Sequence, residues 1–228
     1  MPDPETPLSV HRPEGAPRGG LLVVQEAFGV NDHIEGVCRR LAAEGWLAVA
    51  PHLFHRSGDP TFGYGDISVV MPHMQQLTAE GILADVDAGL AALRDAGVAD
   101  AAIGVVGFCM GGTVALVVGA ERPVGAAVTF YGGGVTKGRF GFPALVDVAP
   151  RLRAPWLGLF GDADAGIPVE EVEQLRTAAA SAPVETEVVR YPDAPHGFHC
   201  DVRDSYRPDA AADAWQRTLA WFDRHLAE

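Results

Sequence analysis

The sequence has few basic residues and few cysteines. Its 228 residues include 17 Lys and Arg against 30 Asp and Glu, which gives a formal charge of −13 with His neutral. The chain therefore lacks the positive field that draws in a phosphate backbone, and this excludes a nucleic-acid partner. The three cysteines, Cys38, Cys109 and Cys200, are widely and irregularly spaced. They do not form a disulfide framework, and at least one of them must be a free thiol.

Targeting and membrane signals are also missing. The first residues are acidic and rich in proline, without the positive region and apolar run of a secretory signal. The longest apolar runs, such as 114–118, are far shorter than the roughly 20 residues that span a bilayer. No repeat or Gly/Ser-rich linker divides the chain. We therefore expect a single domain over residues 1–228, located in the cytoplasm without membrane contact, as a monomer or small homo-oligomer.

Short apolar runs alternate with longer segments of helical periodicity. The expected strands are 20–24, 47–50, 103–106, 126–130, 156–160 and 185–190, and the expected helices are 32–44, 78–96, 111–119, 169–180 and 209–226. This alternation predicts an α/β fold with a doubly wound, mostly parallel sheet and helices on both faces. Sites in such sheets form in the loops beyond the carboxyl ends of the strands. A long segment at 54–74, rich in Gly, Pro and aromatic residues, is expected to wall the active-site cleft.

The most informative motif follows the strand at 103–106. Residues 107–111 read GFCMG and lead into a helix. A G-x-C-x-G pattern in this context is typical of a nucleophile elbow, with cysteine in place of the commoner serine. The sharp turn strains the backbone and crowds positions two residues away, which explains Gly107 and Gly111. The helix N-terminus beside Cys109 favours a thiolate, and its amides can receive an oxyanion.

A cysteine nucleophile needs a base, and the base needs a group that orients it. In hydrolases of this architecture the nucleophile, the acid and the histidine follow one another along the chain in that order. Asp162 and Asp164 follow the strand at 156–160, and His196 follows the strand at 185–190. Their order and placement favour a Cys–His–Asp set with either aspartate as the acid.

These motifs resemble the dienelactone hydrolase family of α/β-hydrolases over about residues 8–226. The carrying sequences are QEAFGVN at 25–31, GFCMGG at 107–112, FYGG at 130–133, GDAD at 161–164 followed by Ile167-Pro168, and HGF at 196–198. The resemblance implies the α/β-hydrolase fold. It also implies hydrolysis of a carboxylic ester or lactone through a cysteinyl acyl-enzyme, with no cofactor and no metal.

The resemblance further implies roles for individual residues. Cys109 is then the nucleophile, His196 the base, and Asp164 rather than Asp162 the orienting acid. Glu26 holds the resting thiol and helps to take its proton as substrate binds. The backbone amides of Ala27 and Met110 form the oxyanion hole. The side chains expected around the substrate are Phe28, His73, Tyr131, Phe198 and Cys200.

The chain departs from the family pattern in its substrate-binding arginines. The family enzyme that acts on dienelactone holds the substrate carboxylate with two arginines. One of these positions is Cys200 here, and the other falls around 67–76, which contains no arginine. Substitute cations are Arg56, Arg203 and Arg207. We therefore expect an anionic lactone to be hydrolysed no better than a neutral ester of similar size.

Two other functions compete with this interpretation. A non-catalytic protein of the same fold would bind a small molecule, but it has no use for a complete Cys–His–Asp set. A metal-dependent hydrolase would use clustered ligands, although no HExxH or paired CxxC motif is present. The ligands in question are His52, His55, His196, His199, Cys200 and Asp201. A nucleotide-binding module is disfavoured because the first strand is not followed by G-x-G-x-x-G or a P-loop.

Overall fold

The computed structural model describes residues 5–226 and places seven strands in one sheet. Across the sheet the order is β1-β3-β2-β4-β5-β6-β7. Strand β1 is antiparallel to β3, and every other neighbouring pair is parallel. The strands are β1 (Leu8–His11), β2 (Gly20–Val24), β3 (Leu47–Pro51), β4 (Ile103–Phe108), β5 (Ala126–Phe130), β6 (Trp156–Gly161) and β7 (Thr186–Tyr191).

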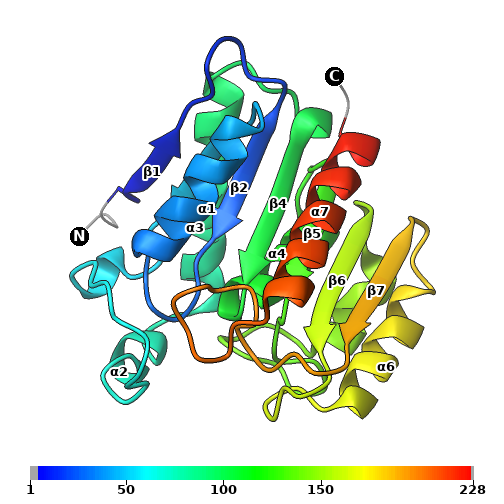
Figure 1. Ribbon diagram of the computed structural model, residues 1–228. Helices are drawn as coiled ribbons and strands as arrows, with labels where there is room; N and C mark the ends of the chain where they lie inside the picture. Colours follow the sequence, from blue (N-terminus) through cyan, green and yellow to red (C-terminus); the bar gives the residue numbers. More distant parts are fainter. Residues whose placement is uncertain (1–4, 227–228) are drawn as a thin grey trace.

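Helices cover both faces of this sheet (Figure 1). Helices α1 and α7 lie over one face, and α3, α4 and α6 lie over the other. The helices are α1 (Asp32–Ala43), α2 (Met71–Met74), α3 (Ala79–Asp95), α4 (Met110–Glu121), α5 (Leu145–Val148), α6 (Val169–Ala179) and α7 (Pro208–His225). Three short 3₁₀ turns occur at His55–Ser57, Asp100–Ala102 and Ala149–Arg151. Within residues 5–226, no helix has both the length and the apolar character needed to cross a membrane.

Burial explains why the sequence pattern predicts this architecture. Strands β2 to β6 are buried along their whole length, because helices cover both of their faces. The doubly wound, mostly parallel sheet is therefore confirmed, and the expected strands and long helices agree with the structure to within two residues at each end. Strand β1 was not predicted, since it is a half-exposed edge strand without a continuous apolar run. The short helices α2 and α5 also lack a sequence signal.

Five loops meet at the carboxyl ends of the parallel strands. Glu26 follows β2, Cys109 follows β4, and Asp164 follows β6. His196 lies in the loop after β7, so the candidate residues gather where the parallel strands end. The segment at 54–74 reaches the same edge, where the backbone amide of Phe62 donates to the carbonyl of Phe28 at 2.9 Å.

Candidate active site

Cys109 sits at a strained turn between β4 and α4. Its backbone has φ 55° and ψ −116°, in a region that residues other than glycine rarely adopt. The tight turn requires glycine on both sides. A Cβ on Gly107 would stand 1.9 Å from the carbonyl oxygen of Gly111, and a Cβ on Gly111 would stand 2.2 Å from the carbonyl oxygen of Val24. The elbow geometry expected from GFCMG is present, and it lifts Cys109 out of the buried core to a partly exposed position.

His196 and Asp164 form a close pair beside Cys109. The Nδ1 atom of His196 lies 2.6 Å from Oδ2 of Asp164, whose carboxylate is almost fully buried. The other oxygen of Asp164 accepts from the backbone amide of Gly166 at 2.8 Å, which fixes the carboxylate. Asp162 is engaged elsewhere, because Arg190 donates to both of its oxygens at 2.7 and 2.8 Å. Of the two aspartates, the structure therefore places Asp164 with the histidine.

The surroundings of His196 favour its protonated form. Burial by itself lowers the pKa of the ring, but the sulfur of Cys109 and the carboxylate of Asp164 outweigh burial and raise the pKa to about 10. Part of this effect is a hydrogen bond between His196 and the side chain of Cys109. A ring held between sulfur and carboxylate can take a proton from the thiol and keep it until a leaving group needs it.

A pH dependence of stability follows from this raised pKa. The imidazolium form stabilises the fold fully below the ordinary pKa of 6.5, and this contribution is lost as pH rises through about 10. In Asp164→Asn the ring loses its carboxylate partner. The Tm of this variant should therefore fall furthest below wild type near pH 6.5, with a smaller deficit toward pH 10. Thermal unfolding by circular dichroism measures the deficit, and a deficit that grows with pH would contradict the pairing.

Glu26 is buried with no exposed surface, and its carboxylate has three partners. Tyr64 donates its hydroxyl to Oε2 at 2.7 Å, and Tyr131 donates to Oε1 at 3.4 Å. Arg203 places Nη1 at 3.7 Å from Oε1 and supplies a positive charge. Within residues 5–226 no hydrogen bond joins Glu26 to Cys109. The role of Glu26 in holding the resting thiol stays a prediction.

An open cleft of about 730 Å³ lies over Cys109. Ala27 borders this cleft, and Met110 follows Cys109 directly and begins α4. The role of their two backbone amides as an oxyanion hole stays a prediction. The 54–74 segment contributes an apolar wall, as expected from its length and composition. The residues of this wall are Ile67, Met71 and Met74, and the first two remain largely exposed.

The five side chains expected around the substrate do not line this cleft. Tyr131 and Phe198 are fully buried and pack on each other with ring centroids 5.4 Å apart, because they continue the aromatic core beneath the site. Phe28 packs on Tyr64, and Cys200 is fully buried, where burial raises the pKa of its thiol to about 11. His73 faces a separate hollow, with Nδ1 2.8 Å from the Ser57 hydroxyl. Tyr131 still reaches the site from below, since its ring centroid lies 5.0 Å from that of His196.

The substitute cations named from the sequence also lie outside the cleft. Arg56 pairs with buried Asp85 at 2.7 Å, Arg203 is beside Glu26, and Arg207 donates to backbone carbonyls.

Two other cations line the cleft instead, Lys137 and Arg139 in the loop after β5. Lys137 is the one lysine in the chain, and neither side chain forms an ion pair within the part of the chain that the structure describes. The sequence did not predict them because they lie beyond the FYGG motif at 130–133, in a part of the loop that has no motif of its own.

The histidines considered for a metal-dependent hydrolase do not converge. His52 contacts Asp59 at 2.8 Å, and His55 contacts Asp85 at 2.9 Å. His196 is paired with Asp164, while His199 accepts from Arg40 at 3.1 Å. These partners lie in different parts of the fold, so the histidines do not surround one ion.

The fold and the site together define the class of protein to which this chain belongs. A cysteine at a strained strand–helix turn, with a histidine–aspartate pair at the same edge of a mostly parallel sheet, is the arrangement of an α/β-hydrolase. The chain belongs to the dienelactone hydrolase family, whose model matches residues 8–226.

Individual relatives agree with this assignment. A protein from Methylorubrum extorquens, provisionally named a carboxymethylenebutenolidase, is 41% identical over 215 residues, covering 93% of this chain and 74% of its own length. A carboxymethylenebutenolidase from Rhodococcus opacus is 33% identical, covering 90% and 81% of the two chains. A crystal structure from Klebsiella pneumoniae, provisionally described as a dienelactone hydrolase, superposes with a TM-score of 0.89 at 40% identity, covering 96% of this chain and 93% of that one. The resemblance seen in the sequence motifs is therefore confirmed.

Proposed function

We propose that this hydrolase cleaves a carboxylic ester or lactone through an acyl-cysteine intermediate on Cys109. The observation that carries the proposal is the alignment of a partly exposed Cys109, His196 and buried Asp164 along one cleft. We propose that it acts in the cytoplasm and needs neither a metal nor an organic cofactor for this reaction.

The reaction proceeds in two steps, acylation of Cys109 and hydrolysis of the resulting thioester. His196 takes the thiol proton, the sulfur of Cys109 attacks the carbonyl carbon, and a C–S bond forms as the C–O bond breaks. The departing alkoxide receives the proton from His196 and leaves as an alcohol. Water then attacks the thioester, giving its proton to His196, and the C–S bond breaks to release the acid and restore the thiol. Asp164 keeps the proton-bearing Nδ1 oriented in both steps.

The developing oxyanion is stabilised by backbone amides. In the proposed cycle these are the amides of Ala27, which borders the cleft, and of Met110, which follows Cys109, and α4 adds the partial positive charge of its N-terminus. Glu26 lies behind the nucleophile in a buried cluster with Tyr64 and Tyr131. In the proposed cycle its carboxylate controls the protonation of the resting thiol when substrate binding rearranges the cluster.

The experiment that tests this function traps the intermediate. Wild-type enzyme is mixed with a short p-nitrophenyl ester, quenched in acid and digested with trypsin. The three cysteines fall on three different tryptic peptides, so the modified residue is identified by mass alone. We expect the acyl mass on the Cys109 peptide and not on the peptides of Cys38 and Cys200. Turnover with no acyl mass on Cys109 would overturn the mechanism, and binding without turnover would identify a non-catalytic binding protein.

The cleft cations revise the expectation about substrate charge. With Lys137 and Arg139 in its wall, the cleft suits a substrate with a carboxylate remote from the scissile bond. Exchanging both for glutamine should raise KM for an anionic ester by about three- to tenfold, the effect of one or two partly exposed ion pairs, with kcat little changed. A neutral ester of the same size is the control and should respond little. An equal rise in KM for both esters would rule out the charge contact.

A further inference from the structure

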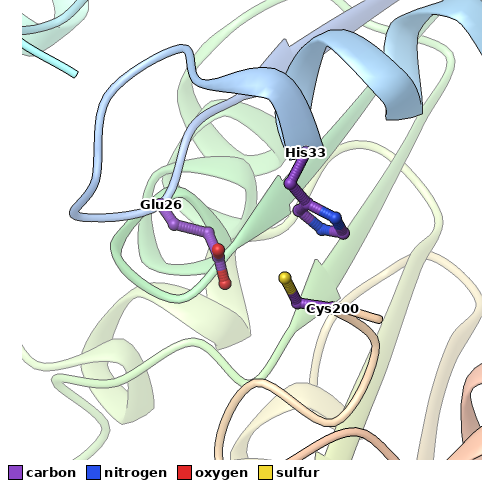
Figure 2. A group of neighbouring side chains, drawn as sticks. All are labelled: Glu26, His33 and Cys200. Carbon is purple, nitrogen blue, oxygen red and sulfur yellow. The ribbon is translucent and has the colours of Figure 1, made fainter. Parts of the chain in front are cut away.

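Three potential metal ligands converge behind the nucleophile from three separate elements. Glu26 comes from the loop after β2, His33 from the first turn of α1, and Cys200 from the loop after β7 (Figure 2). One ligand atom from each lies within 4.8 Å of the other two, and no other group of this kind occurs in residues 5–226. Glu26 and Cys200 have no exposed surface, and the side chain of His33 is 7% exposed. The sequence does not predict this group of three residues, because they lie far apart along the chain.

His33 leaves one of its nitrogens without a partner. Its Nδ1 lies 3.8 Å from Oδ1 of Asp201, whereas its Nε2 is buried and forms no hydrogen bond. A buried polar atom without a hydrogen-bond partner destabilises the fold, and a ligand that satisfies it is favoured. The ring therefore has one nitrogen that is free to bind a ligand, and it belongs to a residue that lies beside a carboxylate and a thiol.

We propose that Glu26, His33 and Cys200 form a binding site for Zn²⁺. Imidazole nitrogen, thiolate sulfur and carboxylate oxygen are the ligands that zinc prefers, and the sulfur and nitrogen disfavour Mg²⁺ and Ca²⁺. Around tetrahedral zinc such ligand atoms stand about 3.5 Å apart, so small side-chain rotations bring this group to bonding distance. The thiol proton leaves to solvent on binding, and the carboxylate and thiolate then balance the two charges of the ion. Water completes the fourth position.

Access to this site does not pass through the substrate cleft. His33 lines a second, larger cleft of about 990 Å³, whereas none of the three ligands lines the substrate cleft. The polar and aromatic residues that border this cleft include Arg40, Tyr64, His199, Asp201 and Trp215. Cys109, His196 and Asp164 do not border it. An ion can therefore reach His33 while the substrate cleft is occupied.

The bound ion would take over the place of Arg203 as the positive partner of Glu26. The Nη1 atom of Arg203 lies 3.7 Å from the carboxylate, a distance too long for a strong charge-assisted hydrogen bond. The guanidinium also packs over the rings of Phe28 and Tyr64, which hold it when the ion binds. Tyr64 holds Oε2 of Glu26 at 2.7 Å, whereas the contacts of Oε1 with Tyr131 at 3.4 Å and with Arg203 at 3.7 Å are longer. Oε1 is therefore the oxygen that the metal displaces from its partners more easily.

Cobalt titration tests the site directly, because tetrahedral Co²⁺ replaces Zn²⁺ and reports a thiolate ligand by its charge-transfer absorption. The proteins are wild type, Cys200→Ser, His33→Gln and Cys109→Ala, with Cys38→Ala as the matched cysteine control. We expect one Co²⁺ per chain with a thiolate band, displaced by Zn²⁺, in wild type, Cys109→Ala and Cys38→Ala. Cys200→Ser should lose the band, and His33→Gln should bind at least about tenfold more weakly.

Two results would overturn the site. The first is an absence of saturable metal binding by the wild-type protein at micromolar concentrations. The second is a thiolate band that survives in Cys200→Ser but vanishes in Cys109→Ala, which would place the ion on the catalytic cysteine. Circular dichroism checks that each variant is folded. If Cys200→Ser does not fold, unchanged affinity in His33→Gln overturns the proposal by itself.

An effect of zinc on catalysis is a separate consequence, and it rests on the proposed function of Glu26. A coordinated carboxylate can no longer act on the thiol of Cys109, so zinc should inhibit wild type and have at least about tenfold less potency on His33→Gln. Full activity of the zinc-loaded wild-type protein would refute the role of Glu26 without affecting the direct binding result.

Discussion

Replacing Cys109 with alanine should lower kcat/KM for a short p-nitrophenyl ester by about 10⁴-fold or more. In the proposed mechanism the covalent intermediate forms on the sulfur of Cys109, and alanine has no atom that could replace it. Cys109 lies at the strained turn and borders the same cleft as His196. The remaining amides and His196 can still polarise a bound ester and activate water. The residual rate should therefore exceed that of the uncatalysed reaction.

The matched control for this variant is Cys38→Ala. Cys38 is fully buried on α1, and burial raises the pKa of its thiol to about 12, so this cysteine is not a nucleophile. We expect its replacement to leave the esterase rate within about twofold of wild type. A chelator should not diminish the wild-type rate. Equal rates for wild type and Cys109→Ala would refute the cysteine mechanism, and loss of activity on chelation would favour a metal-dependent one.

A second large effect, on stability, is expected when Gly107 is replaced, although glycine has no reactive group. A Cβ at this position would lie 1.9 Å from the carbonyl oxygen of Gly111, and the neighbouring backbone of α4 has no free space to retreat into. Relief of this overlap requires β4 and the start of α4 to separate. We expect Gly107→Ala to lower the free energy of unfolding by more than about 4 kcal/mol, a large fraction of the roughly 5–15 kcal/mol by which a typical domain is stable. The variant should be unfolded or insoluble at ordinary temperature.

Urea and thermal unfolding measure this effect, with Gly36→Ala as a control. Gly36 lies inside α1, and a Cβ there would meet only the guanidinium of Arg39 at 3.6 Å. Because alanine favours the helix by about 1 kcal/mol relative to glycine, this variant should keep or slightly raise the Tm. A Gly107→Ala protein with the Tm of wild type would mean that the turn at Cys109 is not as tight as described.

Most of the fold could be predicted from the sequence because its central strands are apolar throughout. The runs at β2, β4 and β5 are buried on both faces, and a short, continuous apolar run between two helical segments is typical of a strand in a covered parallel sheet. Strand β1 could not be found in this way. It is a four-residue edge strand with mixed exposure, and it exists because β3 offers it an antiparallel partner, which is a tertiary effect.

The sequence predicts those site residues that directly follow a strand. It does not predict contacts between side chains that come from distant segments of the chain. Cys109 and His196 each follow a predicted strand, so topology alone places them at one edge. The surroundings of Glu26 are different, since Tyr64 and Arg203 approach it from segments far away in the sequence. Aromatic residues next to catalytic positions were also misleading, because Tyr131 and Phe198 are fully buried beneath the site instead of lining it. A single sequence does not distinguish these two placements.

The position of Lys137 has a practical consequence. Since it is the one lysine in the chain and lies exposed in the cleft wall, an amine-reactive dye can attach only there and at the chain's α-amino group. Labelling near pH 7 to 8 favours the α-amino group, because an unperturbed lysine is almost fully protonated there, whereas a more alkaline reaction adds the cleft position. A fluorophore on Lys137 would report the arrival and departure of ligands optically, without the introduction of a further cysteine.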